Sequence, residues 1–76
     1  MDKILLTRGN NNREVTLTVP LELRAKVSFN VITDIIMMNN CNLTVYKVDL
    51  QKVIILNIKG EENSIKNVTN KIEGLL

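Results

Sequence analysis

The pattern that most constrains the fold is a strict alternation of apolar and polar residues between positions 14 and 19. The apolar members are Val15, Leu17 and Val19, and the polar members are Glu14, Thr16 and Thr18. A period of two is typical of a strand that buries one face. Pro20 follows, and it suits both the end of a strand and the first turn of a helix because it has no backbone N–H. The pattern predicts a strand at residues 14–19 with a helix directly after it.

A further strand is expected upstream of this one. Residues 4–6 are apolar, and residues 8–13 place one glycine and three asparagines between two arginines. Glycine and asparagine tolerate left-handed backbone angles, so this segment is typical of a turn. We expect the two strands to form a hairpin.

Residues 21–38 predict a single helix that ends at Asn39-Asn40. One stripe at helical spacing contains Leu23, Val27, Val31, Ile35 and Met38, and a second apolar set contains Leu21, Ala25, Phe29, Ile32 and Ile36. The β-branched members lower the helix propensity without forbidding a helix. Together the two sets make a wider apolar arc than a helix needs to cover one sheet face.

The second half of the chain predicts another hairpin and another helix. Residues 43–50 and 52–58 are expected to be strands joined by a turn at residues 49–52. Gly60 should break the last strand, and Glu61-Glu62 should open a helix, where acidic side chains favour the positive end of the helix dipole. The buried stripe of this helix is expected at Ile65, Val68 and Ile72, and Gly74 suits its C-terminal end.

The resulting order is β-β-α-β-β-α in one α+β domain spanning residues 1–76. From residue 14 onward this order matches the first five elements of a ferredoxin-like open-faced sandwich. That fold normally ends with a fourth strand beside the first. Here we expect the N-terminal strand to replace that last strand, since it forms a hairpin with residues 14–19.

Residues 14–74 resemble small ferredoxin-like domains of the heavy-metal-associated and ACT types. The resemblance is carried by the strand at 15–19, the segment at 48–55 and the Gly60-Glu61-Glu62 entry to the last helix. Heavy-metal-associated domains hold metal with a Cys-x-x-Cys pair after their first strand, and residues 20–26 of this chain contain no cysteine. The glycine-containing ligand loop of ACT domains is also missing. The resemblance therefore implies the fold, without metal transfer or ligand binding.

Residues 13–27 also resemble the strand and first helix of ribbon–helix–helix DNA-binding proteins. In that family, strands paired between two chains enter the major groove and their outward side chains contact bases. The resemblance would give this role to Glu14, Thr16 and Thr18. It ends where that family has a turn and a second helix, because residues 31–36 continue the apolar helical pattern without a break.

Few residues in the chain suit catalysis or metal binding. The chain has no histidine and a single cysteine, Cys41, flanked by asparagines with no nearby cation. Cys41 therefore has no candidate base, and we expect a small, partly buried residue at a helix-to-strand junction. Asp34 lies beside the apolar helix stripe, where a solvated helix residue is favoured over a functional one. The three glycines are isolated, so no phosphate loop is expected. We expect no enzyme activity, no cofactor and no metal.

The charge distribution allows an alternative function. Residues 1–26 carry five lysines and arginines against three acidic residues, an excess of two positive charges that equals the net charge of +2 for the whole chain. A dimeric nucleic-acid-binding protein would use the basic residues of this segment: Arg8, Arg13, Arg24 and Lys26. No apolar stretch is long enough to cross a membrane. We therefore expect a cytoplasmic protein with no membrane partner.

The favoured function is protein binding or self-association through the sheet. Val53 and Ile55 lie opposite Ile54, Leu56 and Ile58 in the strand pattern. If Leu43 and Val45 face the helices, the outer face carries four apolar or amphipathic residues: Tyr46, Val48, Val53 and Ile55. Contiguous exposed patches of this kind mark interaction sites, and a homo-oligomer is the expected form. The alternative is that a twisted hairpin or a loop makes both faces internal.

Overall fold

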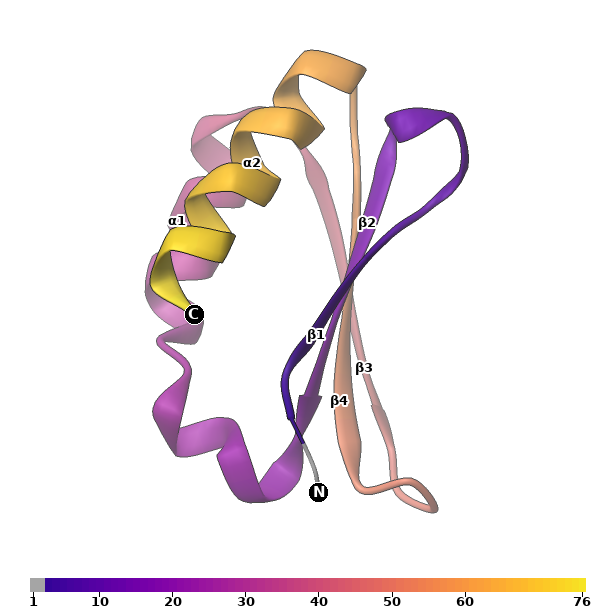
Figure 1. The fold of residues 1–76 in the computed structure, drawn as a ribbon, viewed down its shortest axis with the longest axis vertical. Helices are drawn as coiled ribbons and strands as arrows, with labels where there is room; N and C mark the ends of the chain where they lie inside the picture. Colours follow the sequence, from indigo (N-terminus) through magenta and orange to yellow (C-terminus); the bar gives the residue numbers. More distant parts are fainter. Residues whose placement is uncertain (1–2) are drawn as a thin grey trace.

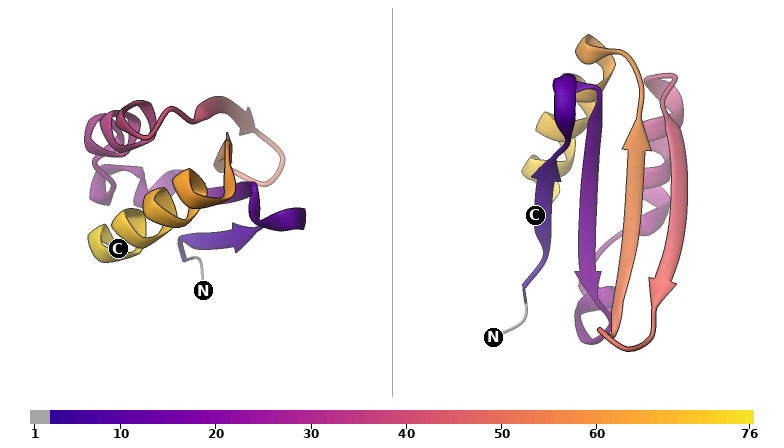
Figure 2. Two further views of the ribbon diagram at one scale, coloured as in Figure 1. Left: turned by 90° about the horizontal axis from the view of Figure 1, so that it is seen from above. Right: turned by 90° about the vertical axis from the view of Figure 1, so that its right-hand side faces the viewer.

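A computed structural model describes residues 3–76 and shows four antiparallel strands and two α-helices (Figure 1). Along the chain the elements are β1 (Leu5–Arg8), the 3₁₀ turn η1 (Asn10–Asn12), β2 (Glu14–Pro20), the 3₁₀ segment η2 (Leu21–Lys26), α1 (Phe29–Met38), β3 (Asn42–Val48), β4 (Val53–Lys59) and α2 (Glu62–Leu75). The sheet order is β1-β2-β4-β3. Both helices cover the same face of the sheet (Figure 2), so the α+β open-faced architecture predicted from the sequence is confirmed.

The register of the strands fixes which side chains share a face. Leu17 of β2 lies opposite Leu6 of β1 and Leu56 of β4, and Leu56 lies opposite Val45 of β3. Because side chains alternate along each strand, one parity of residues faces the helices and the other faces away. Both predicted hairpins, β1–β2 and β3–β4, are present.

The core lies between the sheet and the two helices and is aliphatic. Its buried members are Val15, Leu17, Val19, Val27, Ile32, Ile36, Leu56, Ile58, Ile65, Val68 and Ile72. The alternation at residues 14–19 and the predicted stripe of the last helix both supply buried residues, as expected. Burying such side chains stabilises the fold by about 1.5–3 kcal/mol each relative to exposure.

The continuous helix predicted for residues 21–38 is wrong. Residues 21–26 form η2, and Val27 then adopts an extended conformation with φ −112° and ψ 125° before α1 begins. Figure 1 shows η2 carrying the chain from the lower end of the sheet to the helix layer, and a straight helix starting at Leu21 would not make this crossing. β-branched Val27 accepts extended angles readily. Ser28 occupies the N-cap position of α1, where its side chain makes no capping hydrogen bond.

The break also changes which apolar residues of the segment are buried. Ile32 and Ile36 face the core, whereas Val31 and Met38 are 41% and 78% exposed. The second apolar set predicted for this segment therefore supplies the buried face of α1. Since α1 has only ten residues, the wide apolar arc leaves part of its surface in solvent.

The first turn has the backbone conformation predicted from its asparagines, whereas α2 does not end at the predicted glycine. In η1, Asn11 and Asn12 have φ of 64° and 56°, so the asparagines supply the left-handed positions of the first turn. Gly74 does not end α2, which continues to Leu75. None of the glycines in the described part of the chain has a positive φ.

Candidate interaction surface

The four residues predicted for the interface lie together on the face of the sheet that points away from the helices. Tyr46 of β3 is paired with Ile55 of β4, and Val48 is paired with Val53. Paired residues of antiparallel strands project from the same face with their Cβ atoms about 4.5–5.5 Å apart. The four side chains are therefore neighbours in two adjacent strands.

A fifth apolar residue, Leu5 of β1, extends this surface across the sheet. Leu5 is paired with Thr18, and Thr18 is paired with Ile55 on its other side. We call Leu5, Tyr46, Val48, Val53 and Ile55 the outer apolar patch. Sequence reasoning missed Leu5 because the three-residue apolar run at 4–6 does not show which of its residues face the core.

The members of the outer apolar patch differ in their exposure to solvent. Tyr46 and Leu5, on the two edge strands, are 47% and 46% exposed, and the other three members are partly buried by their neighbours. Figure 2 shows this face of the sheet bare, with both helices behind it. Within residues 3–76, no helix or loop covers the outer face.

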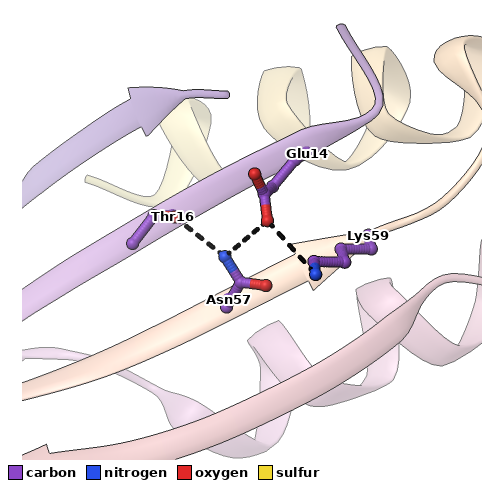
Figure 3. A network of polar contacts seen from close by, with 4 residues as sticks. All are labelled: Glu14, Thr16, Asn57 and Lys59. Atoms are coloured by element: carbon purple, nitrogen blue, oxygen red, sulfur yellow. Dashed lines mark hydrogen bonds and ion pairs between the residues drawn. The ribbon is translucent and has the colours of Figure 1, made fainter. Parts of the chain in front are cut away.

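The other half of the outer face is polar and carries a small network (Figure 3). Asn57 Nδ2 donates to Glu14 Oε2 and to Thr16 Oγ1, both at 3.1 Å. Lys59 Nζ lies 3.6 Å from the same carboxylate oxygen of Glu14. The four residues come from β2 and β4, so the network ties the two central strands together at the end remote from Val53.

The basic residues predicted for nucleic-acid binding are not brought together. Arg8 and Arg13 flank the β1–β2 turn, whereas Arg24 and Lys26 lie in η2, beyond the opposite end of β2 (Figure 1). Strand β2 is hydrogen-bonded to β1 on one edge and to β4 on the other. It has no free edge for pairing with a strand of another chain.

A cavity of about 250 Å³ lies between the β1–β2 turn and α2. Its lining residues are Arg8, Asn12, Glu14, Glu62, Ile65, Lys66, Thr69 and Asn70. The two cations face two carboxylates, so the cavity has no excess of one charge that would select an anion or a cation. The Thr69 hydroxyl is buried and has no hydrogen-bond partner among the described residues.

Cys41 occupies the predicted junction between α1 and β3 and is partly buried. Its Sγ donates to the carbonyl oxygen of Asn39 at 3.6 Å. Burial raises the pKa of the Cys41 thiol above its ordinary value, because the thiolate loses solvation there. A raised pKa lowers the thiolate fraction at neutral pH and makes Cys41 a poor nucleophile.

The remaining findings concern metal ligands, membrane-spanning helices and similarity to known proteins. No cluster of three or more histidine, cysteine, aspartate or glutamate side chains that would hold a metal ion occurs within residues 3–76. No helix in the described part of the chain has the length and apolar character needed to cross a membrane. Comparison with protein-family models, curated proteins and solved structures finds no match for this chain.

Proposed function

We propose that this chain is a non-catalytic module for self-association or protein binding, built on a ferredoxin-like sandwich. The strand order β1-β2-β4-β3 supports the fold assignment, since β1 occupies the sheet position that the last strand of that fold usually fills. The fold alone does not indicate a function, because the same sandwich serves many. The function is argued from the outer apolar patch.

The observation that carries the proposal is the composition of the uncovered sheet face. A sheet that packs helices on one side normally presents polar side chains on the other. Here Tyr46, Val48, Val53 and Ile55 form one continuous group on the solvent side. Aliphatic and tyrosine side chains grouped in this way are typical of surfaces that lose water on binding a protein.

The test replaces two members of the patch by residues of similar shape that are more polar. In the Val53→Thr/Ile55→Thr variant the β-branched side chains keep their strand preference while the apolar surface shrinks. The matched control is Val31→Thr/Val45→Thr, because Val31 on α1 and Val45 on the inner face of β3 are exposed and lie outside the patch. Sedimentation velocity gives the mass, and circular dichroism gives the melting temperature.

We expect wild type and control to associate with rising concentration, and the Val53→Thr/Ile55→Thr variant to remain a folded monomer. Two results, obtained together, would overturn the proposal. These are a wild-type chain that is monomeric at every concentration, and a patch variant that loses as much stability as Leu56→Thr, which alters a buried core residue. Val53 and Ile55 would then belong to the core.

A further inference from the structure

We infer that the partner of the outer face is a second copy of this chain, stacked face to face about a two-fold axis parallel to the strands. The axis lies in the interface, midway between β2 and β4. This inference rests on the proposed function and specifies its partner. It is argued from the arrangement of charge and apolar surface on the two central strands.

Each residue of β2 is paired with a residue of β4 at the same height along the strands, and we call each such pair a level. From one end to the other, the outward pairs are Pro20 with Val53, Thr18 with Ile55, Thr16 with Asn57 and Glu14 with Lys59. A half-turn about an axis parallel to the strands exchanges β2 with β4 of the other copy and leaves each level unchanged. Every outward residue of β2 then lies over the residue with which it is already paired.

This exchange makes the charges complementary. Glu14 of each copy comes to lie over Lys59 of the other, and each is already 3.6 Å from its partner within the same chain. The four groups alternate in sign around the axis, so each charge has opposite charges as its nearest neighbours. Complementary charge of this kind fixes the register of an interface and disfavours other arrangements.

The apolar levels also match under the same operation. Ile55 lies over Thr18 of the second copy, and the edge strands bring Leu5 over Tyr46. A two-fold axis across the strands would instead place each strand over its own copy in reverse, with Val53 over Lys59 and Pro20 over Glu14. That arrangement would bury charged groups against aliphatic ones, which is unfavourable.

The size of the face indicates a weak dimer. The axis keeps the strands of the two copies aligned, and sheets that pack face to face keep their mean strand directions within about 30° of each other. Three seven-residue strands and the four-residue β1, at about 4.8 Å spacing and about 3.3 Å rise, give a footprint of roughly 400 Å² per copy. This is about half of the roughly 800 Å² that each partner buries in a standard specific interface, so we expect weak association that depends on concentration.

The test uses two charge-reversed chains, Glu14→Lys and Lys59→Glu. In a homodimer of either variant, positions 14 and 59 of both copies carry the same charge, so four like charges meet at this end of the sheet. In an equimolar mixture, Lys at 14 meets Glu at 59 and Lys59 meets Glu14, which restores attraction. The double variant Glu14→Lys/Lys59→Glu restores attraction in a single chain. Matched controls are Glu73→Lys and Lys71→Glu, which change the same charges on exposed positions of α2.

We expect each Glu14 or Lys59 variant alone to be monomeric at concentrations where wild type is dimeric, and their mixture to sediment as a dimer. The double variant should associate as wild type does, and the α2 controls should associate separately without needing a mixture. Circular dichroism checks that every chain is folded.

Two results overturn the inference and separate its failure from that of the proposed function. If wild type dimerises through Val53 and Ile55 but the charge variants dimerise equally well alone, the patch is an interface and the two-fold arrangement is wrong. If wild type is monomeric at millimolar concentration, a second copy is not the partner.

Discussion

The Sγ atom of Cys41 lies 2.8 Å from the position that a Cβ atom on Gly60 would occupy. The contact joins the start of β3 to the end of β4, where the Gly60 N–H donates to the carbonyl oxygen of Arg13 at 3.1 Å. Any side chain at position 60 must displace either the thiol or the backbone. Packing, and not backbone conformation, therefore favours glycine at this position, since its φ is not positive.

We predict that Gly60→Ala lowers the free energy of unfolding by about 1–3 kcal/mol, the usual range for an overpacked site. Adding Cys41→Ala removes the sulfur and should recover part of the loss, so the two effects should not be additive. Gly74→Ala is the control, because nothing lies within 4 Å of its Cβ position. It should leave stability unchanged or raise it by up to about 1 kcal/mol. Urea unfolding measures these three variants and the single variant Cys41→Ala, and additive losses would contradict the predicted contact.

The thiol of Cys41 should react slowly and should make stability fall at alkaline pH. Burial raises its pKa in the folded chain, so the unfolded chain loses the thiol proton at a lower pH than the folded chain. Above the unfolded pKa, ionisation favours the unfolded state, and stability falls until the folded pKa is passed. Alkylation by iodoacetamide near pH 8 should be slower in buffer than in urea. Equal rates would show that the thiol is fully solvated.

Thr69→Val should stabilise the chain. The Thr69 hydroxyl is buried without a partner among residues 3–76, and leaving such a group unsatisfied costs about 1–3 kcal/mol. Valine keeps the shape and removes the polar atom, so we expect the free energy of unfolding, measured in urea, to rise by about 1 kcal/mol. Thr69→Ser keeps the hydroxyl and loses the methyl group, and it should destabilise. A loss of stability in Thr69→Val would show that the hydroxyl is hydrogen-bonded.

Lys52→Asn should also raise stability, because Lys52 has a φ of 54° in the turn between β3 and β4. Asparagine adopts this left-handed conformation at less cost than lysine does. We expect a gain of about 0.5–1 kcal/mol in the free energy of unfolding. Gln51→Asn, at a neighbouring residue without a positive φ, should give no gain. If both variants behave alike, the backbone conformation at position 52 is not the cause.

The elements predicted correctly from the sequence are those whose pattern depends on local chain geometry. The alternation at residues 14–19 and the spacing of Ile65, Val68 and Ile72 each bury one face, and that face is the same in the structure. The break at Val27 has a tertiary cause, the passage from sheet to helix layer. The periodic pattern runs through it, so the sequence does not show the break.

Candidate surface residues could be predicted within one hairpin. They could not be predicted where they depend on pairing with a third strand. The turn at residues 49–52 fixes how Tyr46 and Ile55 meet, so the outer group followed from the hairpin. Leu5 joins it only through pairing with Thr18. The network of Glu14, Asn57 and Lys59 likewise depends on β2 lying beside β4, a pairing between strands far apart in the sequence.

The most direct measurement of the central claim is a dilution series followed by methyl signals in NMR spectra of the wild-type chain. We predict that methyl signals of Leu5, Val48, Val53 and Ile55 shift together between micromolar and millimolar concentration. Signals of Val31 and Leu75, which are exposed on the helix layer, should stay fixed. Fixed signals on the outer face, or shifts centred on Val31, would contradict the claim that the outer apolar patch is the surface through which this chain associates.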